Sequence, residues 1–243
     1  MAAHERTGRG VPRVWLFDLD NTLHNASYAS LRDINERMST YIERELGLSR
    51  PQADALRRDY WIRYGATLLG VVRHHQVDAA HFLHDTHDIA DLESRVHGHA
   101  HDFAALKRLP GRHYILSNAP RHYVRRVLHA LGLQRWFDGV LCVEDMRMFG
   151  HLRPKPDARM LRRMAVRLKV HPRDCVLVED TLEHQKAARQ VGMRTVWVQR
   201  WRRRAFEVPE QRRHLRWRPP YVDRCVLSLG ELCRWPHFQP PQP

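Results

Sequence analysis

The chain has 243 residues, of which 43% are hydrophobic, and a formal net charge of +14. Its length allows one main core with a smaller appended unit and excludes two full-sized domains. No stretch of the sequence approaches the roughly 18 uninterrupted apolar residues of a membrane span, and the apolar run Val14 to Phe17 is shorter than the core of a signal peptide. We therefore expect a cytoplasmic protein that has no membrane partner.

The segment VWLFDLD, which begins at Val14, predicts a buried strand because aromatic and branched apolar residues run unbroken into a pair of acids. Residues 24–105 follow it and differ in kind, since they show helical periodicity and no convincing buried strand. Leu31, Ile34 and Met38 share one helical face, and a second helical segment runs from Ala53 to Tyr64. This pattern predicts a helical insert placed directly after the first strand.

Beyond the insert, short apolar runs alternate with helical patterns. The runs predict strands at 113–118, 139–145, 175–180 and 194–199, with an edge strand at Cys225 to Leu229. This alternation indicates an α/β fold, a Rossmann-like parallel sheet flanked by helices. The expected domains are a core of residues 1–23 and 106–232, the insert 24–105, and a proline-rich tail 233–243.

The cysteines and histidines predict no soft-metal or redox site. The four cysteines form no CxxC pair, which favours reduced thiols in a cytosolic protein. His81, His84 and His87 recur at helical spacing, but a spacing supplies neither the carboxylate or thiolate context nor the second shell of a metal site.

The basic stretch from Arg200 to Arg218 is the best local argument for a nucleic-acid partner, because Trp201 and Trp217 interrupt its arginines. No helix-turn-helix, zinc-finger or RNP pattern accompanies it, so a solvated loop is the favoured interpretation. A basic nucleic-acid-binding protein that uses residues 200–218 is kept as an alternative function.

Polar residues close several of the predicted strands. Asp18, Asp20 and Thr22 follow the first strand, Ser117 and Asn118 the second, and Glu179 and Asp180 the fourth, while Lys155 lies just after the third in RPKPD. Because ligands of open parallel sheets bind beyond the carboxyl ends of the strands, we expect these side chains to converge.

Such a set of residues suits the hydrolysis of a phosphomonoester. Attack by a carboxylate on a phosphate dianion needs charge neutralisation, which Mg²⁺ on the oxygens of Asp18, Asp180 and Glu179 would supply, while Lys155 and Ser117 hold the phosphoryl oxygens. Asp18 and Asp20 share one face of an extended chain, so Asp18 is the expected nucleophile and Asp20 the expected acid and base.

The series DLDNT, ILSNAP, RPKPD and VLVED resembles the four motifs of the haloacid dehalogenase superfamily over residues 14 to 199. The resemblance implies that Asp18 and Asp20 are catalytic, that the backbone carbonyl of Asp20 also ligates Mg²⁺, and that the insert is a cap over the substrate. We assign phosphate binding to four residues: Thr22, Ser117, Asn118 and Lys155.

Further stretches, among them RYGATLLG and ALGLQRWFDGV, are similar to those of pyrimidine 5'-nucleotidase-like members, which implies a nucleoside monophosphate as substrate. Tyr64, Thr67 and Leu68 are then the candidates for substrate contact from the cap. One position departs from the pattern of many members, because His184 stands where they place a second acid, four residues after Asp180.

Chemistry separates some of the alternatives. A dehalogenase would leave Asp20 superfluous because a halide needs no proton, and a phosphonatase would need a cap lysine, which residues 24–105 lack. A phosphotransferase or phosphomutase stays open, since it would use the same residues. The sequence also leaves open the oligomeric state and the choice among UMP, other nucleoside monophosphates, FMN and pyridoxal phosphate.

Overall fold

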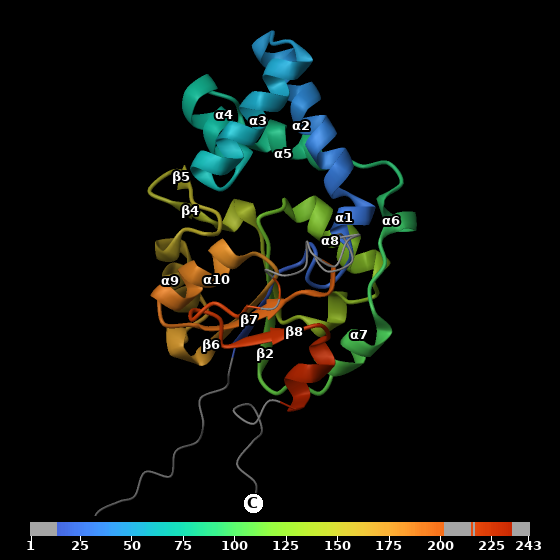
Figure 1. Ribbon diagram of the computed structural model, residues 1–243, viewed down its shortest axis with the longest axis vertical. Coiled ribbons are helices and arrows are strands. Elements are labelled where there is room, and N and C mark those ends of the chain that lie inside the picture. The colour runs from blue at the N-terminus through green and yellow to red at the C-terminus, as the bar shows by residue number, and fades with distance from the viewer. Residues whose placement is uncertain (1–13, 202–214, 216, 235–243) are drawn as a thin grey trace, which may run out of the picture.

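The protein is described by a computed structural model of residues 14–201, 215 and 217–234. A bundle of helices stands over an α/β core in which helices flank a central sheet (Figure 1). Among the described helices, none is both long enough and apolar enough to cross a bilayer.

The core sheet has six strands, and every pair of neighbours is parallel. Their order across the sheet is β3-β2-β1-β6-β7-β8, with bounds β1 Val14–Phe17, β2 Arg112–Leu116, β3 Gly139–Leu141, β6 Cys175–Glu179, β7 Arg194–Val198 and β8 Arg224–Val226. The predicted α/β parallel sheet is thus confirmed. The apolar run that begins at Cys225 does supply the edge strand, and its end lies in the 3-10 helix η5, Leu229–Arg234.

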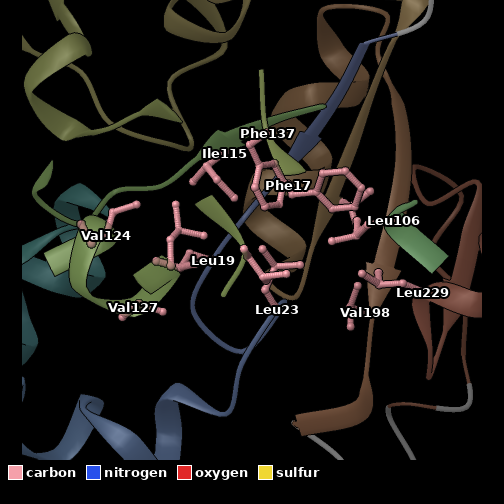
Figure 2. Close-up of a cluster of buried hydrophobic side chains, with 14 of the residues drawn as sticks. Phe17, Leu19, Leu23, Leu106, Ile115, Val124, Val127, Phe137, Val198 and Leu229 are labelled. Atoms are coloured by element: carbon pink, nitrogen blue, oxygen red, sulfur yellow. The ribbon is translucent and has the colours of Figure 1, made fainter. Parts of the chain in front are cut away.

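Both faces of the sheet are buried, which explains why β1 is apolar at every position. Trp15 and Phe17 point into one apolar cluster, while Val14 and Leu16 point into the other. Helices α7 (Ala100–Leu106) and α8 (Arg121–Ala130) cover the first face. Helices α9 (Ala158–Arg167) and α10 (Leu182–Gln190) cover the second. Figure 2 shows Phe17 beside Phe137 and Ile115 within the first cluster.

The third predicted strand is shorter than its apolar pattern. It ends at Leu141, and Val143–Asp145 form a 3-10 turn, η2, because the Asp145 carboxylate accepts the Cys142 backbone N–H at 2.9 Å and bends the chain. A small antiparallel hairpin follows, made of β4 (Arg147–Met148) and β5 (His151–Leu152).

The predicted insert 24–105 contains helices of two kinds. The bundle of α2 (Leu31–Leu46), α3 (Arg50–Tyr64), α4 (Thr67–His75) and α5 (Ala79–His87) has an apolar cluster of its own. By contrast α6 (Leu92–Arg95) and α7 contribute to the cluster on the sheet, and the short α1 (Ala26–Ala29) adds Ala29 to it. We use the word cap for α2–α5 alone.

Glycine is required where α3 and α4 cross. A Cβ atom on Gly70 would lie 2.1 Å from the ring of Tyr60, so only glycine allows the two helices to approach this closely. The contact fixes α3, which carries part of the cavity wall described below.

Asp102 joins α7 to the C-terminal part of the core. Its buried carboxylate accepts hydrogen bonds from Ser228 Oγ at 2.9 Å and Leu229 N at 2.8 Å, and Arg200 Nη1 lies 2.7 Å away. Three donors from two distant segments therefore depend on one acid.

We expect Asp102→Ala to lower the free energy of unfolding by about 3 kcal/mol or more, because it leaves the Arg200 charge and a backbone N–H without their acceptor in a dry site. Asp91→Ala is the matched control, since Asp91 is 65% exposed and pairs with Arg95 at the surface. That change should cost less than about 1 kcal/mol. Urea unfolding of both variants measures the difference, and equal losses would contradict the structural role of Asp102.

Candidate active site

A lysine and two acids meet at the carboxyl edge of the two central strands. Asp18 directly follows β1 and Glu179 ends β6, and the register of these strands, Phe17 opposite Val178, brings the two acids side by side. Lys155 Nζ donates to Asp18 Oδ1 at 2.7 Å and to Glu179 Oε2 at 2.6 Å. All three side chains are buried, so the triad is held away from bulk water.

Glu179 is surrounded by donors. Its carboxylate accepts the backbone N–H groups of Asp180 and Thr181 at 3.2 and 3.3 Å, and His184 Nδ1 lies 3.0 Å from Oε2. Burial favours the protonated form, but Lys155 and His184 outweigh burial and hold the pKa of Glu179 well below its ordinary value. His184 therefore lies beside the site, against the acid at the end of β6.

Asp18 has the opposite balance. Burial, and then the charge of Glu179, raise its pKa to about 7, although Lys155 opposes both effects. Thr22 Oγ1 donates to Asp18 Oδ2 at 3.0 Å, so the side chain predicted to bind phosphate here holds the predicted nucleophile. Among the described residues, the groups around Asp18 therefore leave it short of positive charge.

The residues around Asp18 fit a hard divalent cation. Oxygen atoms of Asp18, Glu179 and Asp180 all lie within 4.8 Å of one another, and all three residues are buried. A purely oxygen donor set favours Mg²⁺ over zinc, and a cation at this place would offset the charge that raises the pKa of Asp18. Among the residues that the structure describes, the histidines of α5 join no such cluster.

Asp20 is held separately from this triad. Its Oδ1 accepts hydrogen bonds from His24 Nε2 at 2.9 Å and from Tyr123 Oη at 2.8 Å. Burial would raise the pKa of Asp20, but these hydrogen bonds and the charge of His24 outweigh it, so the pKa lies below its ordinary value. Sequence reasoning missed His24 and Tyr123, although the spacing of four residues between Asp20 and His24 was a possible signal.

Two further residues predicted to hold phosphate, Ser117 and Asn118, directly follow β2. The side-chain amide of Asn118 donates to the Lys155 carbonyl and its oxygen accepts the Lys155 N–H, both at 2.9 Å. Asn118 thereby fixes the backbone of Lys155. The buried hydroxyl of Ser117 accepts the backbone N–H of Ala119 at 3.1 Å.

A cavity of about 1080 Å³ opens between the cap and the core and reaches Asp20. The three cap residues predicted from the sequence, Tyr64, Thr67 and Leu68, all line it. The sequence analysis missed Arg57 and Trp61, which line the same wall; their spacing to Tyr64 places all three on one face of α3. His184 and Asn118 close the cavity from the core side.

The basic stretch 200–218 lies mostly outside the described residues, since only Arg200, Trp201, Leu215, Trp217 and Arg218 are described. The two arginines at its ends make internal contacts. Arg200 binds Asp102 and the Leu227 carbonyl, and Arg218 donates to the Asp223 carbonyl.

The chain is similar to known proteins over most of its length. A family model described as haloacid dehalogenase-like hydrolase matches residues 12–192. Phosphate metabolism protein 8 of Saccharomyces cerevisiae is 23% identical over 160 residues, which are 60% of this chain and 49% of that protein. The chain thus spans about half the length of this curated relative.

Solved structures share the fold at low sequence identity. A HAD phosphatase from Thermococcus onnurineus matches with a TM-score of 0.59 and 19% identity over 91% of this chain and 96% of that one. An L-2-haloacid dehalogenase from Xanthobacter autotrophicus, with chloropropionic acid covalently bound, matches with a TM-score of 0.55 and 16% identity over 92% and 98%. At such identities the likeness establishes the fold alone.

The raised pKa of Asp18 has a measurable consequence for stability. The folded protein binds this proton more tightly than the unfolded chain, so the free energy of unfolding falls as the pH rises from about 4 to about 7. In EDTA, Asp18→Asn should therefore be more stable than the wild type at about pH 8, by up to about 4 kcal/mol, and similar to it near pH 4.

Urea unfolding at the two pH values tests this expectation. Asp157→Asn is the control, because interactions with Arg153 and Arg159 outweigh burial and hold the pKa of Asp157 below its ordinary value. That variant should gain no stability at about pH 8. If the wild type is as stable as Asp18→Asn at about pH 8, the ionised form of Asp18 does not destabilise the folded protein, and the expectation is wrong.

Proposed function

Since the chain belongs to the haloacid dehalogenase-like hydrolases, we propose that it is a magnesium-dependent phosphatase that hydrolyses small phosphomonoesters through a phosphoryl-aspartate on Asp18. The observation that carries this proposal is the arrangement of two acids with different surroundings. Asp18 lies in the buried triad with Lys155 and Glu179, whereas Asp20 reaches the cavity and has a carboxyl held by two donors.

The chain's own residues account for both half-reactions. A carboxylate oxygen of Asp18 attacks phosphorus, the bond from phosphorus to the ester oxygen breaks, and Asp20 gives that oxygen a proton, which the carboxyl holds once the negative charge of the bound phosphate has raised its pKa. Asp20 then takes a proton from water as the water attacks the phosphorus of the acyl phosphate, which releases inorganic phosphate and restores Asp18. Lys155 Nζ and the Ser117 hydroxyl hold the phosphoryl oxygens.

Asp18, Asp180, Glu179 and the carbonyl of Asp20 are the proposed ligands of Mg²⁺. When bound there, the ion supplies the positive charge that lets two anions approach. The oxygen-only donor set and the raised pKa of Asp18 both support a cation at this position.

A phosphatase explains Asp20 better than a dehalogenase does. A departing halide takes no proton, so a dehalogenase would gain nothing from a second acid at the cavity. An alcohol leaving group needs one. The presence of Asp20 at the cavity therefore favours an ester substrate over a haloacid.

We further propose that the substrate is a nucleoside monophosphate, as in a pyrimidine 5'-nucleotidase-like enzyme of the cytoplasm. The cavity wall supports this, because Trp61 and Tyr64 offer aromatic surface for a base and Arg57 and Arg58 add positive charge. A phosphate-release screen over UMP, other nucleoside monophosphates, FMN and pyridoxal phosphate tests the choice. Release from none of them would overturn the proposed substrate class.

We expect Asp18→Asn to reduce kcat below detection, because it removes the nucleophile while keeping the volume of the side chain. Asp20→Asn should lower kcat by about 10² to 10⁴-fold, the usual range for loss of a general acid and base. Phosphate release from UMP measures both. Asp91→Asn, on the exposed end of the Arg95 pair, is the control and should retain wild-type rates. Near-normal turnover by Asp18→Asn would exclude the covalent route.

Mg²⁺ should also raise the thermal stability of the protein without any substrate. A ligand present at 100 times its Kd adds about 2.7 kcal/mol, which corresponds to roughly 5 to 10 °C in Tm for a chain of this size. Asp180→Asn should remove most of this shift, whereas Asp157→Asn should keep it. Thermal unfolding in MgCl2 and in NaCl of equal ionic strength separates binding from salt effects. An unchanged Tm in the wild type would contradict the metal site.

A further inference from the structure

One carboxylate oxygen of Asp20 accepts two hydrogen bonds. His24 Nε2 and Tyr123 Oη both lie within hydrogen-bond distance of Oδ1, and both rings are fully buried. The other ring nitrogen of His24, Nδ1, is also buried and has no hydrogen-bond partner in the described part of the chain. His24 therefore carries a proton on Nε2, through which it donates to Asp20.

The Tyr123 hydroxyl has its own support. Ser30 Oγ lies 2.7 Å from it. The single hydroxyl proton of Tyr123 is used in the hydrogen bond to Asp20. Ser30 is therefore the donor in its hydrogen bond with Tyr123. The ring of His87 packs edge-on against Tyr123 with ring centroids 5.6 Å apart. The orientation of the tyrosine is thus fixed at its hydroxyl and at its ring.

Ser30 and His87 mark the two ends of the cap. Ser30 immediately precedes α2, and His87 is the last residue of α5. Tyr123 belongs to α8 in the core, so this one side chain contacts both segments where the chain enters and leaves the cap.

We propose that Tyr123 and His24 are positioning residues that hold the Asp20 carboxyl so that Oδ2 exchanges the proton with the leaving oxygen and with water. Ser30 aligns the Tyr123 hydroxyl for this purpose. The inference deepens the proposed phosphatase function and rests on it.

The hydrogen bonds to Asp20 decide which of its two oxygens carries the transferable proton. An oxygen that already accepts two hydrogen bonds has no room for a proton of its own, so the transferable proton is carried by Oδ2. Loss of one donor lets the carboxyl rotate about its terminal torsion, which is broad and soft for Asp. Displacement of a reacting group by about 1 Å can cost as much as 10²-fold in rate.

The test compares leaving groups in Tyr123→Phe. An alkyl phosphate, such as UMP or glycerol 2-phosphate, releases an alkoxide that needs the proton, whereas p-nitrophenyl phosphate releases a stable anion. We expect kcat/KM to fall about 10-fold for the alkyl phosphates and less than about 2-fold for p-nitrophenyl phosphate. The value of kcat/KM is used because it covers the step in which the ester bond breaks and not the later hydrolysis of the acyl phosphate.

The ratio of the two kcat/KM values in one preparation does not depend on the fraction of folded enzyme, so a loss of stability does not imitate the effect. Ser30→Ala should shift the ratio in the same direction by a smaller factor. Tyr41→Phe is the matched control, because its hydroxyl also bonds a histidine, His81, at 2.9 Å but lies within the cap and away from the cavity. That variant should leave the ratio unchanged.

Two results would overturn the inference, and they are distinguishable. If the wild type is active and Tyr123→Phe loses the same factor on both kinds of substrate, the tyrosine is merely structural, while the proposed function stands. If the wild type releases phosphate from neither kind of substrate with Mg²⁺ present, the proposed function fails and the inference fails with it.

Discussion

The site depends on one buried cation, the ammonium group of Lys155, which lies between the carboxylates of Asp18 and Glu179. Removing two acids from water is costly unless a positive partner compensates them, and Lys155 can compensate only in part. Glu179 gains the larger share, because two backbone N–H groups and His184 also face it. Asp18 is left with an excess of negative surroundings and a raised pKa, and a divalent cation at this place would offset that excess.

Sheet geometry produces this arrangement. Parallel neighbours end at the same edge, so β1 and β6 deliver Asp18 and Glu179 next to each other with no further adjustment. Lys155 arrives from the segment before α9, where the Asn118 side chain binds both polar groups of its backbone. Because the apolar clusters on the two sheet faces hold the strands rigidly, the charged groups cannot separate to reduce their mutual repulsion. The fold thus tolerates an acid whose ionised form is disfavoured by its surroundings.

The cap contacts the core at Tyr123 as well as around the cavity. Its helix α3 carries Arg57, Trp61 and Tyr64 along the cavity wall, and its two ends meet at Tyr123, whose hydroxyl holds Asp20. The same small bundle therefore lines the cavity that reaches Asp20 and contacts the residue that hydrogen-bonds the Asp20 carboxyl. The related folds include a phosphatase and a dehalogenase, so the overall architecture does not choose between these chemistries.

Local signals in the chain predicted the apolar runs that became strands, the helical periodicity between them, and the acids that follow several strands. These follow from side-chain period and burial, which neighbouring residues fix. Contacts between segments far apart in the sequence became visible in the folded protein alone. Asn118 proved to bind the backbone of Lys155, Tyr123 reached Asp20 across 103 positions, and α6 and α7 packed on the sheet although they lie within the predicted insert. Hydrogen bonds and packing between remote residues leave no periodic trace in the chain, because they are set by where whole helices and strands dock.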